Sequence, residues 1–99
     1  MSRPELDFLA SHELDVYGFQ GCPDCARLKL WLENAGVRHR EVDIDAQPQA
    51  AERLERETGK QAVPFILVDG KTWVRGYHKE LPARFDARIL IAELRSALG

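Results

Sequence analysis

The chain has 99 residues, a formal net charge of −2 at pH 7, and 44% apolar against 30% charged residues. This length and mixture predict one globular domain with a modest core. The charge offers no basic field for nucleic acid or an anionic membrane, and no apolar run approaches the roughly 20 residues that span a bilayer. The first residues lack the apolar core of a secretory signal, so we expect a cytoplasmic, monomeric protein.

The chain begins with a short segment that has a pattern of its own. Residues 1–13 hold one small apolar cluster, and we expect them to form an N-terminal extension with one helical turn. The sequence then predicts a single domain over 14–99. Its first element is a β-prone run in which Leu14, Val16 and Phe19 share one face.

Helix and strand patterns alternate through the next thirty residues. After Pro23, apolar residues at helical spacing predict a helix that ends before Gly36. The stretch REVDID at 40–45 alternates as a half-exposed strand. We expect a second helix to follow, with Asp45 as its cap and Pro48 in its first turn.

Two strands and a helix complete the predicted domain. The apolar run at 65–68 suits a strand buried on both faces, Asp69-Gly70 is a type I′ hairpin signal, and 71–75 returns as the partner strand. Helical periodicity resumes from about Asp86. The order β-α-β-α-β-β-α, with the right-handed crossover that its first unit requires, predicts an α/β fold with a mixed four-stranded sheet between flanking helices.

The only two cysteines of the chain form a C-x-x-C pair where the first strand meets the first helix. At this spacing in a helical turn, a disulfide can form and break with little backbone motion. The free N–H groups of the helix start favour a thiolate on Cys22, and we expect Cys25 to be the more buried of the two. The pair therefore predicts thiol–disulfide exchange, with Cys22 as the nucleophile and Cys25 as the resolving thiol.

Asp24 lies between the two cysteines and has two interpretations. Its negative charge should oppose the helix dipole and raise the pKa of the neighbouring thiol, which predicts a more reducing dithiol. Alternatively, Asp24 is an ordinary first-turn acid that supports the helix.

A metal site is the main alternative use of a cysteine pair. Such sites need about four ligands, and His12, His39 and His78 have no ligand-like spacing to each other or to the cysteines. We therefore expect no metal within one chain. A metal or iron–sulfur cluster shared by two chains, or a pair of buried and inert cysteines, remains as an alternative.

Several stretches together resemble the glutaredoxins: VYGFQGCPDCARLKLWLENAG, REVDID and TGKQAVPFILVDG, within about residues 14–98. The resemblance implies a thioredoxin-like (glutaredoxin-type) three-layer sandwich and an enzyme that reduces protein disulfides or glutathionylated thiols. It also implies no tightly bound cofactor, glutathione as a co-substrate, and a cis Val63–Pro64 bond beside the sulfurs, with the Val63 backbone pairing with the substrate. The substrate-binding residues expected from it are Gln20, Pro23, Lys60, Gln61, Val63, Pro64, Gly76, Tyr77 and His78.

The sequence also departs from the usual glutathione-binding pattern of that family. Phe19 stands where a lysine is usual, Ala62 where a threonine is usual, and Gly76 is a single glycine with no acid before Glu80. Trp73 followed by Gly76 looks more like the redoxins that reduce ribonucleotide reductase. The electron donor is therefore open between glutathione, thioredoxin reductase and another thiol.

Two residues after the fourth strand have alternative interpretations. Tyr77 either covers the substrate groove or packs in the core. His78 either stabilises a bound thiolate or carboxylate, or lies in a solvated turn. Trp31 and Trp73 are expected to be core residues.

Overall fold

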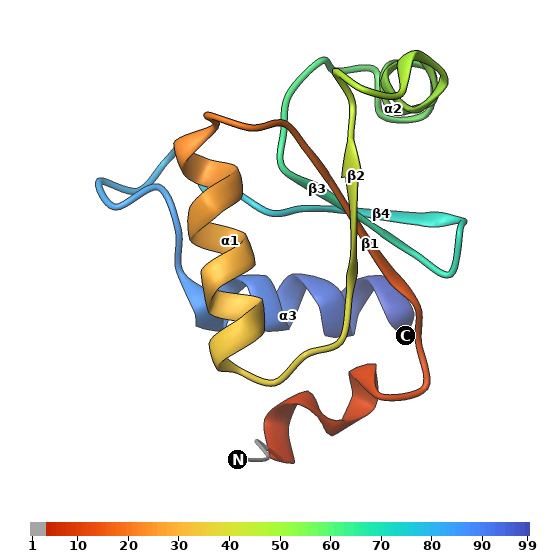
Figure 1. The fold of residues 1–99 in the computed structure, drawn as a ribbon. Helices are drawn as coiled ribbons and strands as arrows, with labels where there is room; N and C mark the ends of the chain where they lie inside the picture. Colours follow the sequence, from red (N-terminus) through yellow and green to blue (C-terminus); the bar gives the residue numbers. More distant parts are fainter. Residues whose placement is uncertain (1–3) are drawn as a thin grey trace.

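The structure is a computed structural model that describes residues 4–99. Four strands form one mixed sheet in the order β2-β1-β3-β4 (Figure 1). β1 (Leu14–Gly18) runs parallel to β2 (Arg40–Asp43) and antiparallel to β3 (Phe65–Val68), which pairs in turn with antiparallel β4 (Thr72–Arg75). The predicted α/β architecture with a mixed four-stranded sheet is confirmed.

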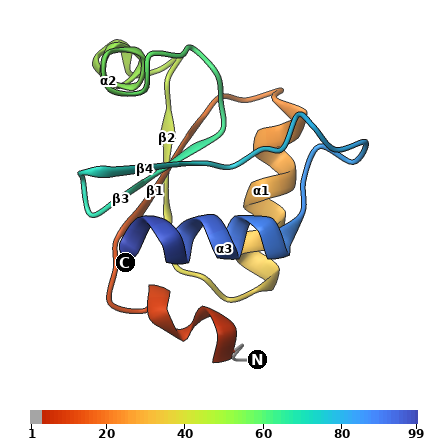
Figure 2. The ribbon, with the colours of Figure 1, turned by 180° about the vertical axis from the view of Figure 1, so that it is seen from behind.

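Three α-helices cover the two faces of the sheet. α1 (Pro23–Asn34) and α3 (Ala87–Leu98) lie together on one face, whereas α2 (Pro48–Thr58) lies apart from them on the other (Figures 1 and 2). No helix among the described residues is long and apolar enough to cross a membrane.

The core is divided by the sheet into two clusters, because side chains on a strand alternate between its faces. Val16 and Ile66 pack with Leu28 of α1 and Leu90 of α3. On the other face, Tyr17 of β1 packs with residues of β3 and α2. All four residues of β3 are buried, as the unbroken apolar run predicts.

The predicted hairpin turn is confirmed, and two details of the prediction are wrong. Asp69 and Gly70 have φ angles of 54° and 70°, as a type I′ turn requires. Phe19 does not share the buried face of β1, because the strand ends at Gly18 and the Phe19 side chain is 38% exposed. Asp45 does not cap α2. The N-cap is Gln47, without a side-chain hydrogen bond.

The N-terminal segment packs against the domain. A 3-10 helix, η1 (Pro4–Leu9), places Leu6 and Leu9 in the cluster that α1 and α3 share, so the expected helical turn is present. Residues 1–3 of the expected extension lie outside the described residues. Arg95 of α3 donates a hydrogen bond to the Glu5 carbonyl at 2.8 Å, which ties the segment to the last helix.

Candidate active site

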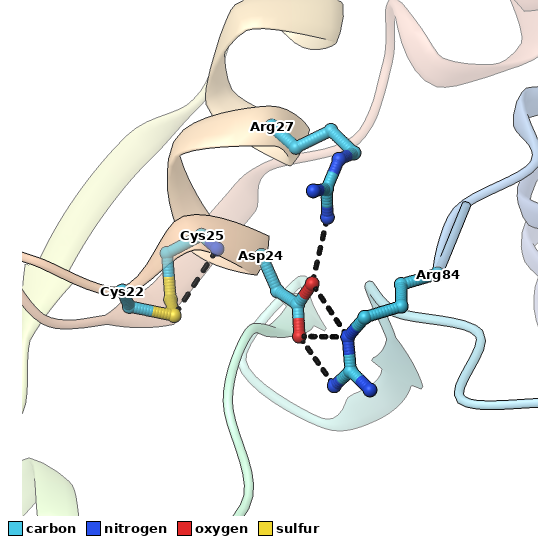
Figure 3. Close-up of a disulfide and its surroundings, with 5 residues drawn as sticks. All are labelled: Cys22, Asp24, Cys25, Arg27 and Arg84. Atoms are coloured by element: carbon cyan, nitrogen blue, oxygen red, sulfur yellow. Dashed lines mark hydrogen bonds and ion pairs between the residues drawn. A yellow bond between two sulfur atoms is a disulfide. The ribbon is translucent and has the colours of Figure 1, made fainter. Parts of the chain in front are cut away.

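The two cysteines lie at the junction between the end of β1 and the start of α1. Cys22 is the N-cap of α1, Pro23 occupies the first turn, and the Cys25 N–H donates to Cys22 Sγ at 3.1 Å. The Cα atoms of the two cysteines are 5.2 Å apart and the sulfurs form a disulfide (Figure 3). The N-cap position and this backbone N–H are the features that stabilise a thiolate at a helix start.

The expectation that Cys25 is the more buried cysteine is wrong for this disulfide-bonded state. Cys22 is only 8% exposed, whereas Cys25 is half-buried. Both cysteines line a pocket of about 520 Å³ between α1 and β2. Cys25 packs closely against the backbone of Gly18, since a Cβ on this glycine would lie 2.8 Å from Cys25 Sγ.

The wall of this pocket includes residues that the sequence interpretation did not select. Lys29 of α1 pairs with Glu41 of β2 at 3.1 Å, and Asp43 and Gln47 also line the cavity. Gln20, one of the expected substrate-binding residues, is among the lining residues as well. The alternation of REVDID could have predicted Glu41 and Asp43 at this site. Because Val42 packs on the α2 side of the sheet, its two neighbours in β2 must face α1.

Asp24 is held by two guanidinium groups, one of them distant in sequence. Arg84 donates from Nε to both carboxylate oxygens at 3.1 Å and from Nη2 to Oδ2 at 2.7 Å, while Arg27 donates to Oδ1 at 2.7 Å. The hydrogen bonds from Arg84 are the main reason that the pKa of Asp24 lies below its usual value, against an opposing effect of burial.

This arrangement changes a premise of the first interpretation of Asp24, whose expected effect on the dithiol stays a prediction. That interpretation assumed an unpaired negative charge beside the thiol. The structure instead places two positive groups on the carboxylate, and the Asp24 side chain is only 14% exposed. No local pattern identifies Arg84 as a partner, because it lies sixty residues from Asp24 and meets it only in the folded chain.

The Val63–Pro64 bond is cis, as the family resemblance implies. The Gly76 N–H donates to the Pro64 carbonyl at 2.9 Å, so the end of β4 packs directly on the proline. A Cβ on Gly76 would lie 2.5 Å from Leu28 Cδ2, which requires a residue without a side chain here. Pro64 and Gly76 are both buried, and Val63 is half-buried.

Three further residues expected to bind substrate are exposed. Pro23 lies at the start of α1 beside Cys22, and Lys60 and Gln61 lie in the loop between α2 and β3. Gln61 Nε2 donates to Glu55 Oε2 at 2.9 Å. These positions leave Pro23, Lys60 and Gln61 accessible from solvent.

Tyr77 is a core residue, in line with the second of its two interpretations. It is buried and packs edge-on against Phe65, with ring centroids 5.8 Å apart. Of the two tryptophans, Trp73 packs against Tyr17, with ring centroids 4.8 Å apart, and donates to Glu57 Oε1 at 2.8 Å. Trp31 is half-buried against the other cluster.

Neither interpretation of His78 matches the structure. The imidazole is fully buried, so in this conformation it meets neither solvent nor substrate. Its Nδ1 accepts from the Asp86 N–H at 3.1 Å, which places the ring proton on Nε2, 2.8 Å from Glu93 Oε1. His78 therefore joins the chain after β4 to the start and the middle of α3.

Among residues 4–99, no group of three or more His, Cys, Asp or Glu side chains is placed to hold a metal ion. The chemistry that this geometry itself provides is reversible bonding between two sulfurs, one of them at a helix N-terminus.

Comparisons with known proteins agree with this geometry. The family model for glutaredoxin matches residues 14–73. A glutaredoxin of Neisseria meningitidis serogroup B is 40% identical over 57 residues, which are 57% of this chain and 66% of the Neisseria protein. The match therefore spans a little under two thirds of that relative.

Solved structures support the same assignment. A variant of the thioredoxin-like protein BC3987 superposes with a TM-score of 0.63 at 24% identity, covering 83% of this chain and 94% of that one, which shows the fold. The glutaredoxin of Archaeoglobus fulgidus has a TM-score of 0.58 at 28% identity, with coverages of 81% and 91%. A buckwheat glutaredoxin–glutathione complex has a TM-score of 0.54 at 26% identity, with coverages of 64% and 60%.

The resemblance seen in the sequence and the predicted thioredoxin-like fold are both confirmed by these matches. The cysteine pair occupies the strand–helix junction inside the matched segment. The chain therefore belongs to the glutaredoxin family of thiol–disulfide oxidoreductases.

Proposed function

We propose that this protein reduces disulfides or glutathionylated thiols of other proteins, with Cys22 as the nucleophile and Cys25 as the resolving thiol. The observation that carries the proposal is the position of Cys22 as N-cap of α1, with the Cys25 N–H directed at its sulfur. A thiolate there is stabilised by the helix start, and its partner sulfur is already within bonding reach.

The reaction proceeds by two exchanges between sulfur atoms. The Cys22 thiolate attacks one sulfur of the target disulfide, a mixed disulfide forms, and the other target sulfur leaves as a thiolate. Cys25, deprotonated in turn, attacks Cys22 Sγ and releases the second target thiolate. Two electrons pass to the target, two protons are taken up from solvent by its thiols, and the Cys22–Cys25 disulfide remains.

Glutathione is the co-substrate that we propose for resetting this disulfide. Two glutathione molecules give up two electrons and leave as glutathione disulfide. Support comes from the buckwheat relative, whose structure is a complex with glutathione, and from the exposed Lys60, which can meet a glutathione carboxylate. No organic cofactor is bound tightly in this scheme, and the protein acts as a cytoplasmic monomer.

Two coupled assays of NADPH consumption test the choice of donor. One contains glutathione and glutathione reductase, and the other contains thioredoxin reductase alone. We expect turnover with glutathione, which would show that Phe19 and Ala62 do not prevent its binding. Turnover with thioredoxin reductase only would overturn the glutathione proposal and keep the exchange mechanism.

Variants of the two cysteines test the mechanism itself. We expect Cys22→Ser to abolish the reduction of protein disulfides, and Cys25→Ser to trap mixed disulfides that mass spectrometry detects. Full activity of Cys22→Ser against protein disulfides would contradict the mechanism. Silence of the wild-type protein in both assays, together with visible absorbance, would instead favour a cluster held between the cysteines of two chains.

A further inference from the structure

One side chain of the loop between β4 and α3 contacts the start of α1. Arg84 lies in this loop and grips the Asp24 carboxylate with three hydrogen bonds of 2.7–3.1 Å. Figure 3 shows the guanidinium group on the far side of Asp24 from Arg27, with the cysteine pair beside them. Asp24 is one of the two residues between the reactive sulfurs, so this contact joins the loop to the redox centre itself.

The loop presents Arg84 in a defined way. The His78 N–H donates to the Arg84 carbonyl at 2.9 Å, and the Arg84 N–H donates to the Leu81 carbonyl at 3.0 Å. Arg84 has a φ of 60°, in the left-handed region that residues with side chains seldom adopt. The base of the loop is closed by the buried His78, which accepts from the Asp86 N–H. This backbone geometry directs a long side chain from a tight turn onto α1.

The contact changes the charge that Cys22 experiences. Asp24 alone would place a negative charge two residues from the nucleophile and disfavour its thiolate. Arg27 offsets this charge from within α1, and Arg84 adds a second positive group, whose planar guanidinium forms the multiple contacts that an ammonium cannot. The other charged groups around the cysteines are Arg27 and Lys29 of α1 and Glu41 and Asp43 of β2.

We propose that Arg84 is a positioning residue for the redox centre: by placing a second positive charge on Asp24 and joining the β4–α3 loop to the start of α1, it favours the thiolate form of Cys22 at neutral pH. The consequence is a dithiol less reducing than Asp24 alone would produce, because a stabilised thiolate favours the reduced form. This inference deepens the proposed function, on which it rests only for the role of Cys22 as the reactive thiol.

The test is a pH titration of thiolate absorbance in the reduced protein, on a Cys25→Ser background in which only Cys22 contributes. Arg84→Gln removes one of the two positive charges on the Asp24 carboxylate and leaves Arg27 as its remaining ion-pair partner. We expect the pKa of Cys22 to rise by about half a unit, from the Coulomb interaction of a thiolate with a partly screened neighbouring charge. The titration needs no substrate, so it can fail while the proposed function stands, and the reverse also holds.

Two further variants separate charge from loop structure. Arg56→Gln is the matched control, because Arg56 pairs with Glu52 on the exposed side of α2, and its titration should match the parent protein. Arg84→Gln/Asp24→Asn removes both charges, and we expect the pKa of Cys22 to return to the parent value. An Arg84→Gln titration identical to that of Arg56→Gln would overturn the proposal. So would a double variant that stays as high as Arg84→Gln, since loss of the loop contact alone would then explain the shift.

Discussion

Gly18 is a single residue whose missing side chain shapes the redox centre. It ends β1 under Cys25, and a Cβ there would lie 2.8 Å from Cys25 Sγ and 3.2 Å from Cys25 Cβ. The first separation is shorter than packed side chains tolerate and the second is tight, and the strand behind Gly18 is fixed in the sheet. A side chain at this position would therefore displace the sulfur that closes the disulfide.

We predict that Gly18→Ala lowers the free energy of unfolding of the oxidised protein by about 1–3 kcal/mol, the usual cost of overpacking. It should also shift the equilibrium between the Cys22–Cys25 disulfide and the dithiol in glutathione redox buffers. Urea unfolding and thiol quantification measure the two effects. Gly70→Ala is the control, because Gly70 has a positive φ but no atoms near its Cβ position. It should cost stability without moving the redox equilibrium, and an unmoved equilibrium in Gly18→Ala would contradict this account.

At the scale of elements, the connection from β4 to α3 depends on buried polar contacts. His78 bonds to the Asp86 N–H and to Glu93, and Asp86 in turn caps α3 by accepting from the Arg88 and Ile89 N–H groups. Because the imidazole is fully buried, its ring nitrogens depend on these protein partners for their hydrogen bonds. This short network fixes where α3 begins and how the loop that carries Arg84 leaves the sheet.

We predict that His78→Phe, which keeps an aromatic ring of similar size, lowers the free energy of unfolding by about 1–3 kcal/mol. The Asp86 N–H loses its partner in a half-buried position, and this unsatisfied donor accounts for the cost. Urea unfolding measures the change, with Tyr77→Phe as a ring-retaining comparison at the neighbouring buried position. A variant with wild-type stability but a raised KM for the target disulfide would instead return His78 to a substrate-binding role.

The elements themselves were largely predictable, and their polar connections were not. The buried β3, the type I′ turn at Asp69 and the disulfide spacing follow from local patterns, because neighbours in sequence decide them. Arg84, which bonds to Asp24, and Glu93, which bonds to His78, come from sixty and fifteen residues away, so only the packed fold brings these pairs together. Local patterns also predicted the wrong N-cap for α2. Asp45 lies instead in the turn before the helix, where its N–H donates to the Asp43 carboxylate at 2.8 Å.

At the scale of the whole molecule, carboxylates link elements that are distant in sequence. Asp69 in the β3–β4 turn accepts from the Glu13 N–H and pairs with His12, which ties the hairpin to the segment before β1. Asp24 ties α1 to the loop before α3, and Glu57 ties α2 to Trp73 of β4. The pKa of each of these carboxyls is lowered, mainly by the backbone N–H of Glu13 for Asp69, by Arg84 for Asp24 and by Trp73 for Glu57.

These shifts predict the direction in which stability depends on pH. A carboxyl whose pKa is lower in the folded than in the unfolded chain contributes stability above its unfolded pKa, about 4, and that contribution disappears as the pH falls through the folded value. We therefore expect the free energy of unfolding to be level near neutrality and to decrease as the pH falls below about 5.

Urea unfolding between neutral and acidic pH measures this decrease, and Asp69→Asn identifies one of its sources. The amide cannot titrate, so the variant should be less stable than the parent at neutral pH and should lose less stability on acidification. Asp7→Asn, which removes a carboxyl from η1 that makes no side-chain hydrogen bond to any other of residues 4–99, is the matched control and should follow the parent curve. Because Asp69 joins the hairpin to the segment before β1, parallel curves for Asp69→Asn and the parent would mean that this junction does not contribute to acid sensitivity, and the prediction would be wrong.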